Sequence, residues 1–209
     1  MGFVKRTPAA PGADDQRQRP RDCAGLAQSL DDPDPAVRRW AARDLAACPD
    51  SSALLAARLA GEPERAVRQA MLLTLTELAD VAAVQGLAAC LRSEDVALRN
   101  DAIEAMKNLP RALPTVMADL LADDDADVRI FAVNILEALR HPEVESWLLR
   151  VIGRDPHVNV CATAVDLLGE VGSERATEAL HGLKLRFPDQ PYIHFAADLA
   201  LRRIQGEGA

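Results

Sequence analysis

The stretch DPDPAVRRWAARDL, residues 32–45, decides the fold, because its outline returns further along the chain. It reappears as DADVRIFAVNIL at residues 125–136 and as DPHVNVCATAVDLL at residues 155–168. Registered on an apolar residue followed by arginine, the pattern has six copies at spacings of 30, 31, 30, 30 and 34 residues, the last two degraded. A regular period of this length predicts a solenoid. The six pairs are Val37-Arg38, Val67-Arg68, Leu98-Arg99, Val128-Arg129, Val158-Asn159 and Tyr192-Ile193.

Each unit of about 30 residues has room for two helices and two short turns. An acid stands four residues before each arginine, and Asp34-Pro35 and Asp155-Pro156 are typical of a helix N-cap followed by proline. The sequence therefore predicts an all-α, right-handed α-α solenoid of about six helix pairs over residues 22–204. The shorter first helices are expected near residues 23–30, 51–60, 81–91, 111–121, 142–152 and 173–183.

The amino-acid composition also favours an all-helical fold, and it predicts that the two ends of the chain lie outside the repeats. Aromatic residues make up only 3% of the sequence, and alanine and leucine, which favour helices over strands, are abundant. Residues 1–21 are rich in proline, glycine, alanine and charge, which predicts a disordered tail. Residues 205–209 are expected to form a second, short disordered tail.

The acid, the apolar-arginine pair, the alanine that follows and the leucine-rich second helix together resemble HEAT-like repeats of the bilin-lyase type. The resemblance covers about residues 22–204 and concerns architecture. It implies that the second helices line the concave face and that turn acids and helix arginines form a structural ladder. The chain departs from the family pattern at Asn159 and Ile193, which marks the C-terminal end as atypical. The implied ladder pairs are Asp34/Arg38, Glu64/Arg68, Asp95/Arg99 and Asp125/Arg129.

Residue types that carry chemistry are not arranged for catalysis, cofactor binding or metal binding. No histidine belongs to a metal-binding spacing, and none is followed by glutamate, as paired di-iron ligands would require. The acidic run at residues 122–128 lacks the glycine and the distant glutamate of a calcium loop. The cysteines form no CxxC pair, so we expect four small, buried, reduced residues: Cys23, Cys48, Cys90 and Cys161.

Charge narrows the classes of partner. The formal net charge is −8, and residues 1–22 contribute five cationic against three acidic side chains, which leaves −10 for the remainder. An excess of negative charge of this size disfavours binding to nucleic acid and to anionic membranes, because both carry negative charge themselves. The start of the chain lacks the apolar run of a signal peptide, and no stretch is long and apolar enough to span a membrane, so a cytoplasmic protein is expected.

The positions on the second helices that point away from the apolar stripe are the candidate partner-binding residues. Leu73, Ile130 and Val160 are apolar at such positions, and a contiguous exposed apolar patch usually marks an interface. The function predicted is a non-catalytic, monomeric scaffold that binds another protein through its concave face. The alternative, drawn from the resemblance, is a subunit of a tetrapyrrole lyase or chaperone-lyase. The candidate residues are Arg39, Arg43, Gln69, Leu73, Asn100, Glu104, Ile130, Asn134 and Val160.

Overall fold

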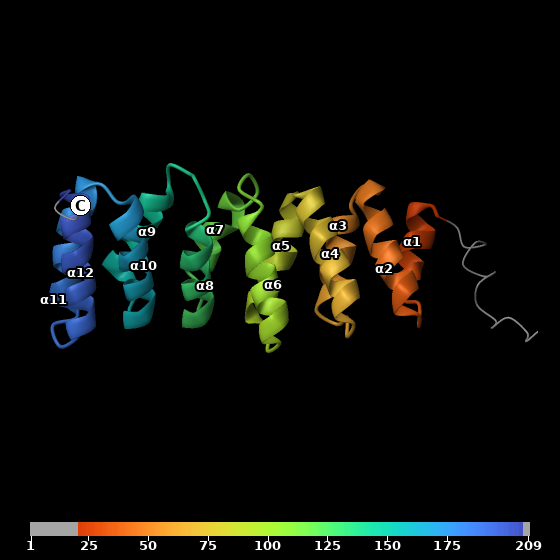
Figure 1. The fold of residues 1–209 in the computed structure, drawn as a ribbon, viewed down its shortest axis with the longest axis horizontal. Helices are drawn as coiled ribbons and strands as arrows, with labels where there is room; N and C mark the ends of the chain where they lie inside the picture. The colour runs from red at the N-terminus through yellow and green to blue at the C-terminus, as the bar shows by residue number, and fades with distance from the viewer. Residues whose placement is uncertain (1–20, 207–209) are drawn as a thin grey trace, which may run out of the picture.

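A computed structural model describes residues 21–206, and within that range the backbone forms twelve α-helices and no strand (Figure 1). The prediction of an all-α solenoid is confirmed. Three short 3-10 helices lie at residues 45–47, 90–92 and 174–176. The helices are α1 (Cys23–Ser29), α2 (Pro35–Asp44), α3 (Ser51–Leu59), α4 (Arg65–Leu78), α5 (Val81–Ala89), α6 (Val96–Lys107), α7 (Pro114–Leu120), α8 (Ala126–Leu136), α9 (Val144–Arg154), α10 (Val158–Val171), α11 (Thr177–Arg186) and α12 (Pro191–Ile204).

Consecutive helices pair into six repeats that follow one another in a row, from α1–α2 to α11–α12 (Figure 1). The even-numbered helices form one layer and the odd-numbered helices the other. Each even-numbered helix packs closely on the next, whereas α1 against α3 and α7 against α9 make little contact. The even-numbered layer is therefore the more tightly spaced one. We call the surface formed by its exposed side chains the concave face.

One continuous apolar core runs between the two layers. It begins at Leu26 in α1, passes through fully buried residues such as Met71, Leu87 and Met106, and ends at Leu201 in α12. A single amphipathic helix pair could not bury such a face alone, and stacking repeats removes it from water. The core thus explains why the sequence outline recurs.

The repeat register changes in the last two repeats, which corrects the alignment made from the sequence. Residue Asp34 caps α2, and Asp95 and Asp125 do the same for α6 and α8, by accepting backbone N–H groups at the helix start. In the fifth repeat the N-cap is His157, because α10 begins at Val158, not at Pro156. Counted from the N-cap, the apolar anchors are the half-buried Val37 and the buried residues Val67, Leu98, Val128, Val160 and Ile193.

The position that holds arginine in the first four repeats therefore holds Cys161 in the fifth, not Asn159. The Cys161 Sγ lies 3.4 Å from the carbonyl oxygen of Asp155, the place that an arginine NH1 takes in other repeats. Burial raises the pKa of the Cys161 thiol to about 11, so the thiol stays protonated. A thiol has replaced the arginine at this position of the repeat, and the Asp155 carbonyl accepts a hydrogen bond from the NH2 of Arg186 at 2.6 Å instead.

Two of the four cysteines form a disulfide, which contradicts the expectation of four reduced residues. Cys23, the first residue of α1, is bonded to Cys48, which follows the turn after α2, with 5.6 Å between their Cα atoms. The pairing depends on α1 folding back against the end of α2, and sequence spacing does not reveal that. Cys90 and Cys161 are free and buried, as expected.

The ends of the chain lie mostly outside the described residues. The predicted N-terminal tail falls there except for Arg21, and so do residues 207–209 of the predicted C-terminal tail. Gln205 and Gly206 form a turn after α12.

The tight packing of α3 on α5 makes Gly86 a sensitive position. A Cβ atom built there would lie 2.1 Å from the Cβ of Ala56, and both belong to helices. We expect Gly86→Ala to lower the free energy of unfolding by about 1–2 kcal/mol, because overpacking outweighs the gain in helix propensity. Urea denaturation would measure the loss.

The matched control is Gly182→Ala in α11, where a Cβ would meet nothing within 4 Å. It should raise stability by about 0.5–1 kcal/mol through helix propensity alone. Equal effects at the two glycines would contradict the close approach of α3 and α5.

Candidate functional site

The ladder arginines connect neighbouring repeats. The Nε and NH2 atoms of Arg38 donate to the two carboxylate oxygens of Glu62 at 2.8 and 2.7 Å, and its NH1 donates to the carbonyl of Asp32 at 2.8 Å. Arg38 lies in α2, whereas Glu62 lies in the turn before α4. The Arg38 side chain thus binds a carbonyl of the turn before its own helix and a carboxylate of the turn in the next repeat.

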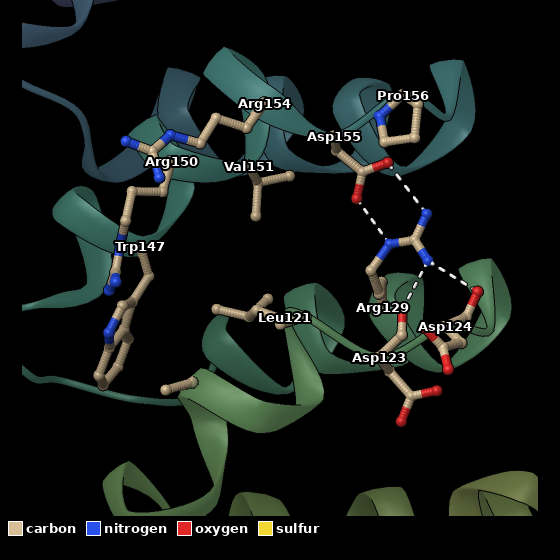
Figure 2. A pocket seen from close by; sticks show the side chains of 12 residues that line it. Leu121, Asp123, Asp124, Arg129, Trp147, Arg150, Val151, Arg154, Asp155 and Pro156 are labelled. Carbon is tan, nitrogen blue, oxygen red and sulfur yellow. Dashed lines mark hydrogen bonds and ion pairs between the residues drawn. The ribbon is translucent and has the colours of Figure 1, made fainter.

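Arg129 repeats this arrangement between the fourth and fifth repeats. It donates to the carboxylate of Asp155 at 2.6 and 3.1 Å and to the carbonyl of Asp123 at 2.7 Å (Figure 2). The side-chain hydrogen bond with Asp155 raises the pKa of Arg129 and outweighs the effect of burial. Both side chains are largely buried, so the pair is a structural feature.

The other two rungs are weaker. Arg68 donates to Asp95 at 2.5 Å, but this carboxylate is partly exposed. Arg99 donates to the carbonyl of Ser93 at 2.7 Å, and its guanidinium lies 5.3 Å from the ring of Phe131. Its buried Nε has no hydrogen-bond partner among the described residues. The link to the fourth repeat is instead an ion pair between Arg92 and Asp123.

The predicted ladder is therefore wrong in its partners, because none of its four arginines is bonded to the acid of its own turn among the described residues. We expected each arginine to bind the acid of its own turn: Asp34, Glu64, Asp95 and Asp125. Three of these acids accept backbone N–H groups at their own helix start, and Glu64 makes no such side-chain bond. Helical side chains point back toward the N-terminus, which brings three of the four arginines to a carbonyl of their own turn and three to a carboxylate of the next repeat.

The concave face holds eight of the nine candidate partner-binding residues. Leu73 is 64% exposed, Ile130 is half-buried and packs against the core, and Val160 is fully buried. Val160 is thus not a surface residue, because it is the buried anchor of the fifth repeat. The remaining six are exposed: Arg39, Arg43, Gln69, Asn100, Glu104 and Asn134.

Exposed aromatic residues at the two ends of the concave face were missed by sequence reasoning. Trp40 is 60% exposed on α2, where the Arg43 guanidinium lies 5.7 Å from its ring centroid. Tyr192 and Phe195 are exposed on α12, and Tyr192 donates to Asp166 at 3.4 Å. The negative charge of Asp166 raises the pKa of Tyr192. Counting from the N-cap would have found Phe195, since it matches Arg39 and Gln69.

A shallow depression between α8 and α10 makes the far end of the concave face acidic. Its volume is about 230 Å³, and three of its lining residues are Glu137, Asp166 and Glu170. The near end carries Arg39 and Arg43. The concave face is thus basic at α2 and acidic at α10.

A larger pocket, of about 500 Å³, lies in the odd-numbered layer between α7 and α9 (Figure 2). Leu121, Trp147 and Val151 supply apolar surface, and Arg150 and Arg154 stand at its edge. The Arg129–Asp155 pair forms the opposite wall. Sequence reasoning gave no sign of this pocket, because it depends on the spacing of two helices that are not consecutive.

Residues 21–206 have neither a metal-binding cluster nor a membrane-spanning helix. No group of three or more His, Cys, Asp and Glu side chains there could hold a metal ion. His141 stacks on Trp147, and His194 lies 3.1 Å from the carbonyl of Phe187. No helix of this part of the chain is both long enough and apolar enough to cross a bilayer.

Repeated helix pairs, a shared core and inter-repeat arginines define an α-solenoid repeat protein. The family model for HEAT repeats matches residues 23–107 and 113–207, well over half of the sequence. The chain belongs to the HEAT-repeat family. The break between the two matched stretches falls between α6 and α7.

Similar solved structures are repeat proteins. An engineered protein is 20% identical, with 90% of this chain and 98% of that chain covered and a TM-score of 0.41. A designed armadillo repeat protein is 16% identical, with 88% of this chain and 100% of that chain covered and a TM-score of 0.39. The complex of CpcE and CpcF of phycocyanin lyase from Nostoc sp. PCC7120 is 19% identical, with 98% of this chain and 99% of that chain covered and a TM-score of 0.38. No curated protein sequence matches the chain. These likenesses carry no argument about function.

Proposed function

We propose that the protein is a non-catalytic scaffold that binds another protein through the concave face. HEAT repeats form extended surfaces on which residues about 30 apart in sequence become neighbours. The observation that carries the proposal is the set of large apolar side chains left exposed there: Trp40, Leu73, Tyr192 and Phe195. Apolar anchors of this kind, surrounded by polar residues, are typical of protein interfaces.

The charges of the concave face specify the orientation of the partner. The side chains of Arg39 and Arg43 favour an acidic segment of the partner at α2, and those of Glu137, Asp166 and Glu170 favour a basic segment at α10. Leu73 and the half-buried Ile130 lie between these ends. A partner with an apolar centre and opposite charges at its two ends fits this surface.

The exposed side chains of the concave face favour the scaffold over the bilin-lyase alternative. The likeness to the phycocyanin lyase complex concerns the fold, and the described residues offer no observation that favours tetrapyrrole chemistry over protein binding. The concave face supports the scaffold directly, through its exposed side chains.

Leu73→Glu tests the proposal at the centre of the concave face. Because Leu73 is 64% exposed, a charge there should leave the fold intact and weaken partner binding at least tenfold, or about 1.4 kcal/mol, if it anchors the interface. The measurement is the affinity for a protein captured by the parent chain and identified by mass spectrometry.

The matched control is Leu185→Glu in α11, an equally apolar residue of the odd-numbered layer that is 83% exposed. It makes the same change in charge away from the concave face and should bind the partner like the parent. The proposal fails if Leu73→Glu binds as tightly as Leu185→Glu does. A loss in both variants would place the interface elsewhere.

A further inference from the structure

The pocket between α7 and α9 is built from one stripe of α9. Trp147, Arg150, Val151 and Arg154 follow one another at i, i+3, i+4 and i+7, so they share a face of that helix, and all four line the pocket. Figure 2 shows Arg150 beside Trp147 and Arg154 beyond Val151, with Leu121 below them. The stripe therefore combines an apolar base with two cationic side chains.

The pocket is open because α7 does not fill the space beside α9. Helix α7 has only seven residues, and the residues from its C-terminal half that line the pocket include Ala118 and, just beyond, Ala122. At the corresponding place between α3 and α5, Gly86 lies against Ala56 and the two helices pack tightly. The fourth and fifth repeats thus have a groove in the odd-numbered layer at the place where α3 packs on α5 and α9 packs on α11.

The two arginines of α9 are free to bind a ligand. Three other charged groups of the pocket have charged partners, because Arg129 binds Asp155 and Asp123 binds Arg92, whereas Asp124 lies at the opposite rim. Arg150 and Arg154 are exposed and make no hydrogen bond or ion pair with any other described residue. Two unpaired guanidinium groups one helical turn apart suit a carboxylate, which arginine binds through paired hydrogen bonds.

We propose that this groove binds a short segment of a partner protein in which an apolar side chain adjoins an Asp or Glu. The apolar side chain packs on Leu121, Val151 and the Trp147 ring, and the carboxylate meets Arg150 and Arg154. Asp124 at the opposite rim disfavours a second acid there. The site is separate from the concave face, because it lies in the odd-numbered layer.

The test uses a leucyl-glutamate dipeptide blocked at both ends and a Trp40→Phe variant, in which Trp147 is the only tryptophan of the chain. Saturable change in Trp147 fluorescence is expected, with a Kd of about 1 mM or tighter. The blocked leucyl-glutamine dipeptide should bind at least tenfold more weakly, since it lacks the charge.

Substituting both arginines, Arg150→Gln with Arg154→Gln, should weaken the dipeptide at least tenfold while the circular dichroism stays that of the parent. The control is Arg202→Gln with Arg203→Gln, which removes two exposed charges from α12 and should leave the affinity unchanged. Leu73→Glu should also leave it unchanged, which separates this site from the concave face.

The proposal would be overturned by the lack of a saturable signal, by equal binding of the glutamine dipeptide, or by equal losses in the two arginine double variants. Binding of free acetate as tight as that of the dipeptide would also overturn it, because the groove would then recognise a carboxylate without the adjoining apolar side chain.

Discussion

Replacing Arg38 with alanine should lower the free energy of unfolding by about 3–5 kcal/mol, because it leaves the buried charge of Glu62 without its partner. The Glu62 side chain is fully buried, and that of Arg38 is 9% exposed. Two hydrogen bonds to Glu62 and one to the Asp32 carbonyl are lost together. Urea denaturation at neutral pH would measure the effect.

Two comparisons test this explanation. Arg68→Ala should lose much less, because its partner Asp95 is partly exposed and can be solvated. The pair Arg38→Met with Glu62→Leu should recover most of the loss, because an apolar pair of similar volume leaves no buried charge. If the double variant is as unstable as Arg38→Ala, the loss comes from packing or from the turn carbonyls and not from Glu62.

The effect should also depend on pH. Burial raises the pKa of Glu62, but hydrogen bonds from Arg38 and the backbone outweigh it, so the pKa lies below its ordinary value. The stabilisation by this pair is therefore present above the unfolded pKa and is lost as the pH falls through the folded pKa. In Arg38→Ala the buried carboxyl protonates readily. The difference between parent and variant should thus shrink at about pH 4.

Breaking the Cys23–Cys48 disulfide should destabilise the first repeat by about 3 kcal/mol. The bond closes a loop that spans 25 positions and contains α1 and α2, and opening it restores chain entropy to the unfolded state. Helix α1 has seven residues and lies at the end of the array, so it has few other contacts to hold it. Hydrogen exchange of the α1 and α2 amides, with and without a dithiol reductant, would measure the change.

The control for the disulfide is the same reductant added to Cys23→Ser. Because Cys90 and Cys161 are free, reductant should change nothing in this variant, and the parent in reductant should match it. Titration of the denatured, unreduced parent should find two thiols. Four thiols, or exchange rates that ignore the reductant in the parent, would contradict the bond.

The architecture was predictable because period, turn acids and proline positions all depend on local sequence. The register of the last repeats was not, because Asp155-Pro156 has the form of an N-cap. In the structure the Asp155 carboxylate instead binds Arg129 from the preceding repeat and the N–H of His157. Because α10 begins at Val158 and not at Pro156, Val160 lies in the core and not on the predicted surface.

The candidate surfaces show the same division. Periodicity alone was enough to predict that residues such as Leu73 and Gln69, which point away from the apolar stripe of α4, are exposed. The α7–α9 pocket was not, because it reflects the short length of α7 and two alanines opposite Trp147. The ladder partners were missed for a similar reason. An arginine side chain is long enough to bypass its own turn and reach the next.

The interrupted ladder has a mechanical consequence. Buried or half-buried arginine pairs brace the first repeat to the second, the second to the third and the fourth to the fifth. Between the third and fourth, Arg99 reaches no carboxylate among the described residues, and the Arg92 side chain of the substitute pair is largely in solvent. The packing of α6 on α8 is also the slightest within the even-numbered layer. The molecule should therefore flex there, as two stiff halves about one joint, and a partner lying across Leu73 and Asn134 would set the angle between them.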